Sequence, residues 1–313
     1  MSSETLPKVP IIDFSNEKLK PGTNSWSSTC KDVRRALEEY GSFIAVYDKV
    51  TKVLEKAIHD AGKEFFDLPI ETKMKNTAER TYHGYVGDIP VIPLHESTGI
   101  DNATTLEGTQ KFTNLMWPNG NENFSETVLT YSKLVAELDE MIQRMIFESY
   151  GVLDKHFESH EASKYYLLRL MKYKVPETNE NNMGFRAHTD KSFAAIIQQL
   201  YIDGLEIETK DGKWIACDLL PHSFVFLAGD VLMGWSNGRI RSAKHRVVLD
   251  TKEVRYSMGL FSFSAGMIQV PEELVDEQHP VRFKSFHHQK FLRFFETEEG
   301  RNAESPLKVF CGV

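Results

Sequence analysis

The residue types best suited to chemistry lie in the second half of the chain. His188 and Asp190 stand two positions apart, and a second histidine, His245, follows downstream. On an extended segment, residues two apart point to the same side, so an imidazole nitrogen and a carboxylate oxygen can meet at one metal ion. Two histidines and one carboxylate leave half of an octahedral iron open, which is typical of non-haem Fe(II) oxygenases.

Arg255 and Ser257 extend this pattern beyond His245. The planar guanidinium of an arginine can grip a carboxylate through two parallel hydrogen bonds. The complete set therefore predicts an iron site with an acidic cosubstrate beside it.

Each of these residues also has an ordinary structural interpretation. His188 alone would most often be a satisfied core histidine, Asp190 could pair with the lysine that follows it, and His245 could lie on a charged strand edge. Arg255 could form a structural ion pair. The triplet His156-Phe157-Glu158 repeats the spacing without such partners, and we expect it in a solvated loop or at a helix end.

Two other classes of protein could use the same residues. A zinc hydrolase accepts two histidines and an aspartate with a water in the open position, although Arg255 and Ser257 then have no hydrolytic purpose. A metal-binding jelly-roll module without turnover is the non-catalytic alternative. Its metal ligands would decay first, and here they are intact.

Composition limits the remaining possibilities. The 313 residues carry a net charge of −8, with 41% hydrophobic and 11% aromatic residues. The acidic balance does not favour a nucleic-acid or anionic-membrane partner. We expect no disulfide framework from three scattered cysteines, no signal peptide at Met1-Ser2-Ser3-Glu4 and no membrane span. A cytoplasmic monomer acting on a small molecule fits these features.

The first half of the chain reads mostly as helices. Apolar residues recur at helical spacing in this half. Short apolar runs before and after the first helix predict strands. Gly41 and Gly151 are plausible terminators. The segment 80–110, rich in glycine and proline, is expected to form a long loop that wraps over the core and lines a pocket. The helices are expected at 27–40, 51–66 and 125–151, and the strands at 9–14 and 43–47.

From residue 165 onwards the pattern changes to short apolar runs separated by turns. This predicts an all-β sandwich, and a jelly roll is the natural candidate. Lys210-Asp211-Gly212-Lys213 and Asn237-Gly238 resemble hairpin turns. The runs are 166–173, 194–200, 205–208, 213–216, 223–227, 245–249 and 256–263.

The predicted fold class is mainly β with flanking helices, namely a double-stranded β-helix (jelly roll) buttressed by N-terminal and central helices. A single domain over 1–313 is expected, with a mostly helical part at 1–160 and the catalytic core at 161–270. Residues 271–313 would form a C-terminal helix or lid. The aromatic and basic stretch from Phe283 to Phe295 fits either a lid or an amphipathic helix packed on the core.

The motifs together resemble the plant-type 2-oxoglutarate- and Fe(II)-dependent dioxygenases over nearly the whole chain. That family carries His-x-Asp, a distal histidine and Arg-x-Ser, which match the residues singled out above. Several flanking motifs agree as well: Val9-Pro10-Ile11-Ile12-Asp13, Gly212-Lys213-Trp214, Gly229-Asp230, Ser236-Asn237-Gly238-Arg239 and Lys244-His245-Arg246.

Other stretches are most similar to the AOP-like branch of that family. This branch also resembles steroidal-alkaloid hydroxylases and, more distantly, auxin-oxidising dioxygenases. The matching stretches are 112–118, 170–180, 186–193 and 271–276.

The resemblance implies a mechanism and further site residues. Fe(II) would be held by the two histidines and Asp190, while Arg255, Ser257 and Tyr173 would bind 2-oxoglutarate. Met171 stands where the family usually has asparagine, so we interpret it as a packing residue. The substrate would contact Phe261, with weaker candidates at Phe185 and Tyr85.

The expected reaction consumes O₂ and 2-oxoglutarate, releases succinate and CO₂, and hydroxylates a plant specialised metabolite. Ascorbate would serve as the reductant in vitro. A steroidal alkaloid or a glucosinolate-related compound is the expected type of substrate. Oxidation of auxin (indole-3-acetate) is the alternative, and desaturation or oxidative cleavage is open to the same chemistry.

Overall fold

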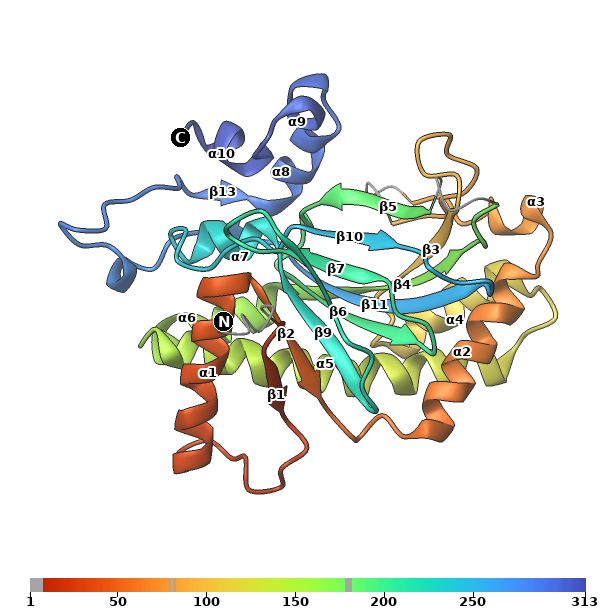
Figure 1. The fold of residues 1–313 in the computed structure, drawn as a ribbon, viewed down its shortest axis with the longest axis horizontal. Coiled ribbons are helices and arrows are strands. Elements are labelled where there is room, and N and C mark those ends of the chain that lie inside the picture. The colour runs from red at the N-terminus through yellow and green to blue at the C-terminus, as the bar shows by residue number, and fades with distance from the viewer. Residues whose placement is uncertain (1–7, 79, 81–82, 178–181) are drawn as a thin grey trace, which may run out of the picture.

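Two β-sheets form the centre of the molecule (Figure 1). The computed structural model describes residues 8–78, 80, 83–177 and 182–313. The larger sheet has the strand order β1-β2-β9-β6-β11-β4-β3, and the smaller has the order β5-β10-β7-β8. All pairings are antiparallel except that of β1 with β2.

The strands are short, as the pattern of apolar runs predicted. In the larger sheet they are β1 Ile11–Asp13, β2 Ser42–Val46, β3 His95–Asp101, β4 Lys164–Tyr173, β6 Ala194–Leu200, β9 Ser223–Ala228 and β11 Arg255–Ser264. In the smaller sheet they are β5 Met183–His188, β7 Leu205–Glu208, β8 Trp214–Ala216 and β10 His245–Val248, and a separate ribbon pairs β12 Met267–Ile268 with β13 Phe286–His287.

The two sheets pack face to face through an apolar cluster. Because side chains alternate along a strand, each strand of the larger sheet has an inner face toward the smaller sheet and an outer face toward the helices. On β11, Ser257 lies on the inner face, whereas Met258 joins the helix-side core. The inter-sheet cluster includes Met171, Tyr173, Ala195, Ile197, Leu205, Ile207, Val225, Leu227 and Val247.

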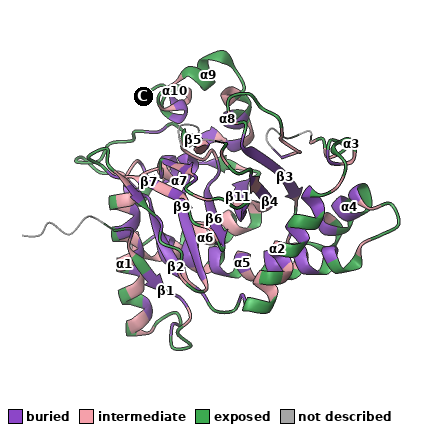
Figure 2. Cartoon of the chain, turned by 45° about the vertical axis from the view of Figure 1, so that its right-hand side comes forward, coloured by how far each residue is buried: buried purple, intermediate pink, exposed green. Residues whose placement is uncertain are grey.

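Helices cover the outer face of the larger sheet (Figure 1). Their apolar sides are buried and their opposite sides are exposed, which is the amphipathic pattern that predicted them (Figure 2). They are α1 Asn24–Tyr40, α2 Lys52–Phe66, α4 Leu106–Met116 and the long α5 Glu122–Ser149. Short helices complete the chain: α3 Ile70–Lys73, α6 Leu153–Ser163, α7 Asp230–Trp235, η2 Glu272–Leu274, α8 His288–Phe295, α9 Glu298–Asn302 and α10 Pro306–Cys311.

Local signals fix the helix ends. Thr23 and Thr51 cap α1 and α2, each accepting a hydrogen bond from a backbone N–H of the first turn. Gly41 ends α1 in the left-handed region (φ 70°), as predicted. A Cβ at Gly41 would also lie 2.5 Å from the carbonyl oxygen of Arg241. Both the backbone conformation and the available space therefore require glycine at this position. None of the helices in the described ranges is long and apolar enough to cross a membrane.

The prediction of a long loop at 80–110 was wrong. The segment contains β3 and α4, and β3 pairs with β4 along its whole length. The strand sequence His-Glu-Ser-Thr-Gly-Ile-Asp lacks apolar alternation because polar groups occupy both of its faces. Glu96 bonds to Lys73 on the helix side, and Ser97 bonds to Arg169 on the inner side. Polar partners on both faces therefore hid the strand from a hydrophobic pattern.

Three smaller expectations also need correction. Asn237-Gly238 follows α7 instead of joining two strands, and the N–H of Gly238 closes the helix onto the carbonyl of Met233. His156-Phe157-Glu158 lies inside α6. The extended segment expected around the metal motif ends at His188, and Asp190 lies in the loop beyond it. The Lys210–Lys213 turn does connect β7 to β8 as a hairpin.

Candidate metal centre and active site

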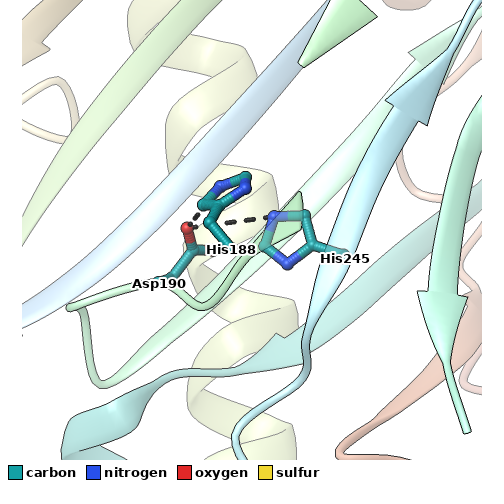
Figure 3. A group of neighbouring side chains, drawn as sticks. All are labelled: His188, Asp190 and His245. Carbon is teal, nitrogen blue, oxygen red and sulfur yellow. Dashed lines mark ion pairs between the residues drawn. The ribbon is translucent and has the colours of Figure 1, made fainter. Parts of the chain in front are cut away.

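Three potential metal ligands converge at one end of the smaller sheet. His188 ends β5 and lies opposite His245, the first residue of β10, with their ring centroids 4.2 Å apart. The Oδ1 atom of Asp190 lies 3.5 Å from His188 Nε2 and 3.9 Å from His245 Nε2. One ligand atom from each residue lies within 4.8 Å of the other two (Figure 3). The fold thus brings together the three residues that the sequence motif singled out.

The hydrogen bonds of the two histidines set their tautomers. His188 donates its Nδ1–H to the carbonyl of Arg186 at 2.8 Å, and His245 donates to the carbonyl of Ala243 at 2.9 Å. A carbonyl only accepts, so in the neutral form of each ring the proton lies on Nδ1 and the lone pair of Nε2 is free. Burial lowers the pKa of His245 to about 4, which keeps the ring neutral. Imidazoles that present Nε2 toward a carboxylate in this way are suited to hold a cation.

Asp190 shows that the site fits a metal ion. Its Oδ2 atom is buried and makes no hydrogen bond among the described residues. Burial works to raise the pKa of Asp190, but the neighbouring imidazoles of His245 and His188 outweigh it and lower the pKa to about 2. An ionised carboxylate with a buried, unpartnered oxygen is costly unless a cation binds it.

The loop that carries Asp190 is held from the segment before α7. The N–H of Asp230 donates to the carbonyl of Asp190, and the Asp230 carboxylate pairs with Lys191 at 2.8 Å. Gly229 packs so closely on this loop that a Cβ there would lie 2.0 Å from the carbonyl oxygen of Ser192. The Gly-Asp motif therefore positions Asp190.

Arg255 lies beside this centre as a buried cation that forms no ion pair among the described residues. Only 1% of the residue is exposed. Its guanidinium donates to the carbonyl of Asp203 at 2.8 Å, to Ser257 Oγ at 3.3 Å and to Gln199 Oε1 at 2.9 Å. It also stacks on the Tyr173 ring, 4.8 Å from the centroid. Burial lowers the pKa of Arg255, and within the described residues no carboxylate pairs with it. A carboxylate ligand would meet this need.

Gln199 is a site residue that the sequence reasoning missed. Its Oε1 accepts from Arg255 and from the N–H of Leu205, while its Nε2 donates to the carbonyl of Cys217 at 2.9 Å. It therefore holds the guanidinium and the turn before β7 together. A buried glutamine within the apolar run of β6 was the available signal, because a buried amide must find partners.

The three residues predicted to contact substrate divide into two groups. Phe185 lies 4.7 Å from the His188 ring, centroid to centroid, and Phe261 lies on the inner face of β11 in register with Ala195 and Leu167. Tyr85 is not brought to this face. Its hydroxyl donates to Glu96 at 2.9 Å, and its ring packs against the helix-side core, so the expectation for Tyr85 is corrected.

Met171 packs as predicted, and the C-terminal segment packs on the end of the sandwich. Met171 belongs to the inter-sheet cluster, with its sulfur 3.9 Å from the Tyr173 hydroxyl. His288 at the start of α8 is fully buried, accepts from the N–H of Ser264 and donates to the carbonyl of Lys191 at 2.8 Å. Within the segment 283–295, residues 288–295 form α8, whose Phe291 is buried in the core. Residues 178–180 of the branch motif lie outside the described residues.

Comparison with known proteins agrees with this geometry. The model of the 2OG-Fe(II) oxygenase superfamily matches residues 163–264, and that of the N-terminal region of non-haem dioxygenases in morphine synthesis matches residues 9–94. An Arabidopsis thaliana protein named "Probable 2-oxoglutarate-dependent dioxygenase AOP1.2" is 43% identical over 324 residues, which cover 99% of each chain.

Solved structures agree as well. The 2-oxoglutarate complex of the dioxygenase for auxin oxidation 1 of Arabidopsis thaliana has a TM-score of 0.78 at 25% identity, covering 87% of this chain and 99% of the other. The rice dioxygenase for auxin oxidation has a TM-score of 0.77 at 27% identity, covering 92% and 95%.

A jelly roll that gathers two histidines, an aspartate and an unpaired arginine defines an iron oxygenase that uses an acidic cosubstrate. The chain belongs to the 2-oxoglutarate- and Fe(II)-dependent dioxygenases, within their AOP-like branch. Its cofactors are accordingly Fe(II) and 2-oxoglutarate.

Proposed function

We propose that this enzyme hydroxylates a plant specialised metabolite at the centre formed by His188, Asp190 and His245. The unpartnered Oδ2 of Asp190 beside two Nε2 lone pairs carries this proposal. The AOP-like relatives support a substrate from specialised metabolism. When bound, Fe(II) with 2-oxoglutarate and O₂ supplies an oxidative decarboxylation that releases succinate and CO₂ and oxidises the substrate.

In this proposal the protein binds, orients and shields the reactants. His188, Asp190 and His245 hold the iron on one side, because the backbone carbonyls fix both imidazoles and Asp230 fixes the aspartate loop. Arg255 binds the distal carboxylate of 2-oxoglutarate through its fork.

Hydroxyl groups and apolar walls complete the cosubstrate site. Ser257 and Tyr173 add hydroxyl groups next to Arg255, and Gln199 keeps the guanidinium in place. The apolar inter-sheet cluster excludes water around these charges, which strengthens each interaction. Phe185 and Phe261 supply aromatic surface toward the substrate.

The test measures iron content and succinate together. Wild type, His188→Ala and His156→Ala are loaded with Fe(II) and assayed with 2-oxoglutarate, ascorbate and a panel of plant metabolites. His156 is the matched control, because its ring pairs with Glu273 at the surface instead of facing a metal site. We expect iron binding and substrate-stimulated succinate in wild type and His156→Ala, with both lost in His188→Ala. Iron-loaded wild type that forms no succinate under any condition would favour the silent module.

Auxin oxidation is the second candidate. The observation that favours it is the structural similarity to two dioxygenases for auxin oxidation at 25% and 27% identity. Indole-3-acetate therefore belongs in the panel beside steroidal alkaloids and glucosinolate precursors. Succinate formation stimulated by indole-3-acetate, with an oxidised indole product, would select this candidate over the others.

We further propose that the enzyme acts as a cytoplasmic monomer without nucleic-acid or membrane partners. Three buried free cysteines and the net charge of −8 support this proposal. Light scattering of the purified chain would test the monomer, and imaging of a tagged chain in plant cells would test the location.

A further inference from the structure

Arg169 is a second cation on the inner face of the larger sheet that the proposed mechanism does not use. It lies on β4, in register with Gly99 on β3 and Gly259 on β11. Glycine on both sides means that neither neighbouring strand contributes a side chain to this row. The long side chain of Arg169 can therefore project between the two sheets, on the same face as Tyr173 and Ser257.

Among the described residues the guanidinium of Arg169 forms no ion pair, and the carboxylates of Asp190 and Asp101 act on it only from farther away. The Nη1 atom of Arg169 donates to Ser97 Oγ at 2.9 Å. Asp101, on the same face of β3, is engaged instead by His83 at 2.5 Å and by Arg80 at 3.9 Å. Burial lowers the pKa of Arg169 to about 10, so the group stays charged at neutral pH.

His95, near Arg169, is a second residue with a buried polar atom that lacks a hydrogen-bond partner among the described residues. The residue is 5% exposed, and the atom is its Nδ1. Its ring lies 5.0 Å from Tyr173 and 4.8 Å from Phe185, between centroids. Phe185 also contacts His188, so His95 and one of the metal ligands pack against the same phenyl ring. Buried polar atoms without partners are rare in native proteins and call for a ligand or a water.

The charges of the loaded site leave Arg169 uncompensated. The double positive charge of Fe(II) and the single charge of Arg255 balance Asp190 and dianionic 2-oxoglutarate. Arg169 adds one further positive charge, which a buried site retains only when an anion or strong hydrogen-bond acceptors compensate it. Asp101 acts on Arg169 from beyond ion-pair distance, so the substrate is the component of the reaction that remains to supply a directly bonded anion.

We propose that Arg169, together with Ser97 and His95, binds an anionic oxygen-bearing group of the substrate, either a carboxylate or a sulfate. This inference rests on the proposed function and narrows its substrate class to organic acids. The anion is held on β3 and β4, and the carbon to be oxidised is directed toward the three metal ligands. Phe185 packs between the two parts of the site and contacts both.

The test compares organic anions with uncharged counterparts. The full chain is loaded with Mn(II) and 2-oxoglutarate, and calorimetry measures the binding of phenylacetate against phenylacetamide, indole-3-acetate against indole-3-acetamide, and phenyl sulfate against phenol. The variants are Arg169→Met and Arg169→Lys. The control is Lys172→Met on the same strand, a cation that faces the helices and pairs with Glu96.

We expect wild type and Lys172→Met to bind the anions roughly thirtyfold or more tightly than their neutral partners, the scale of a buried charge pair. Arg169→Met should remove this preference and Arg169→Lys should restore part of it. The acid pairs and the sulfate pair show which anion the site prefers. Equal binding of anions and neutral partners by wild type would overturn the inference, whether or not the variants fold. Failure of the proposed function is a separate result, namely iron-loaded wild type that forms no succinate.

Discussion

Arg255→Lys is expected to weaken the binding of 2-oxoglutarate while iron binding is retained. Lysine keeps the positive charge but loses the planar fork, so its single nitrogen cannot reach the Asp203 carbonyl, Gln199 and a ligand carboxylate together. A hydrogen bond to a charged group contributes about 1.5–3 kcal/mol. Loss of one of the two fork bonds should therefore raise the apparent KM for 2-oxoglutarate roughly 10- to 150-fold.

The turnover number should change much less than KM, because the three metal ligands are untouched and the lost contact is made before and during the reaction. The fold should lose about 1–3 kcal/mol from the acceptors left without Arg255. Gln199 Oε1 keeps its bond from Leu205, which limits this loss.

The assay titrates 2-oxoglutarate and measures succinate at saturating Fe(II), with urea unfolding as a separate readout of stability. Arg35→Lys is the control, because Arg35 is exposed and pairs at the surface with Asp32. An unchanged apparent affinity for 2-oxoglutarate in a folded Arg255→Lys variant would refute the role assigned to this arginine.

Three further predictions concern the cosubstrate site, the pH dependence of stability and the core. Gln199→Glu places a carboxylate of the protein beside Arg255, where it competes with 2-oxoglutarate for the guanidinium. The KM for 2-oxoglutarate, measured by titration, should therefore rise at least about tenfold. An unchanged KM would contradict the view that Arg255 is available to pair with a ligand carboxylate. Burial lowers the pKa of His288 to about 4, below about 6.5 in the unfolded chain. Its stabilisation is therefore complete above pH 6.5 and is lost as the pH falls toward 4. Because of His288, the free energy of unfolding should drop by about 2 kcal/mol between pH 8 and 5. Urea titrations of His288→Asn at the two pH values should show a decrease that is smaller by this amount. Phe147→Ala removes a fully buried ring stacked on Trp235 at 4.3 Å and should lower the free energy of unfolding by about 3–5 kcal/mol. A decrease below about 1 kcal/mol, as expected for a surface residue, would refute this prediction.

Much of the fold was predictable from the sequence because local patterns dictate it. The apolar runs of β4, β6, β7, β8, β9, β10 and β11 alternate or stay apolar as buried strands do. Threonine caps and Gly41 mark helix ends by chemistry that acts within one turn. Strand β3 escaped prediction because its polar residues are satisfied by partners far along the chain, and no local pattern contains those partners.

The sequence by itself determined the donor set of the metal centre, the secondary elements that carry it and the class of chemistry. Residue types and spacing define which atoms can coordinate a metal ion. Only the tertiary structure decided which polar residues lack partners. The pairing of β3 with β4 places His95, Ser97 and Arg169 on the same face of the sheet as Tyr173. Glu96 of β3 points to the opposite face, toward the helices, where it bonds to Tyr85. The physical reason is that burial and the direction of a strand's faces are properties of the packed sheets, and the cost of an unpaired charge arises only after packing removes water.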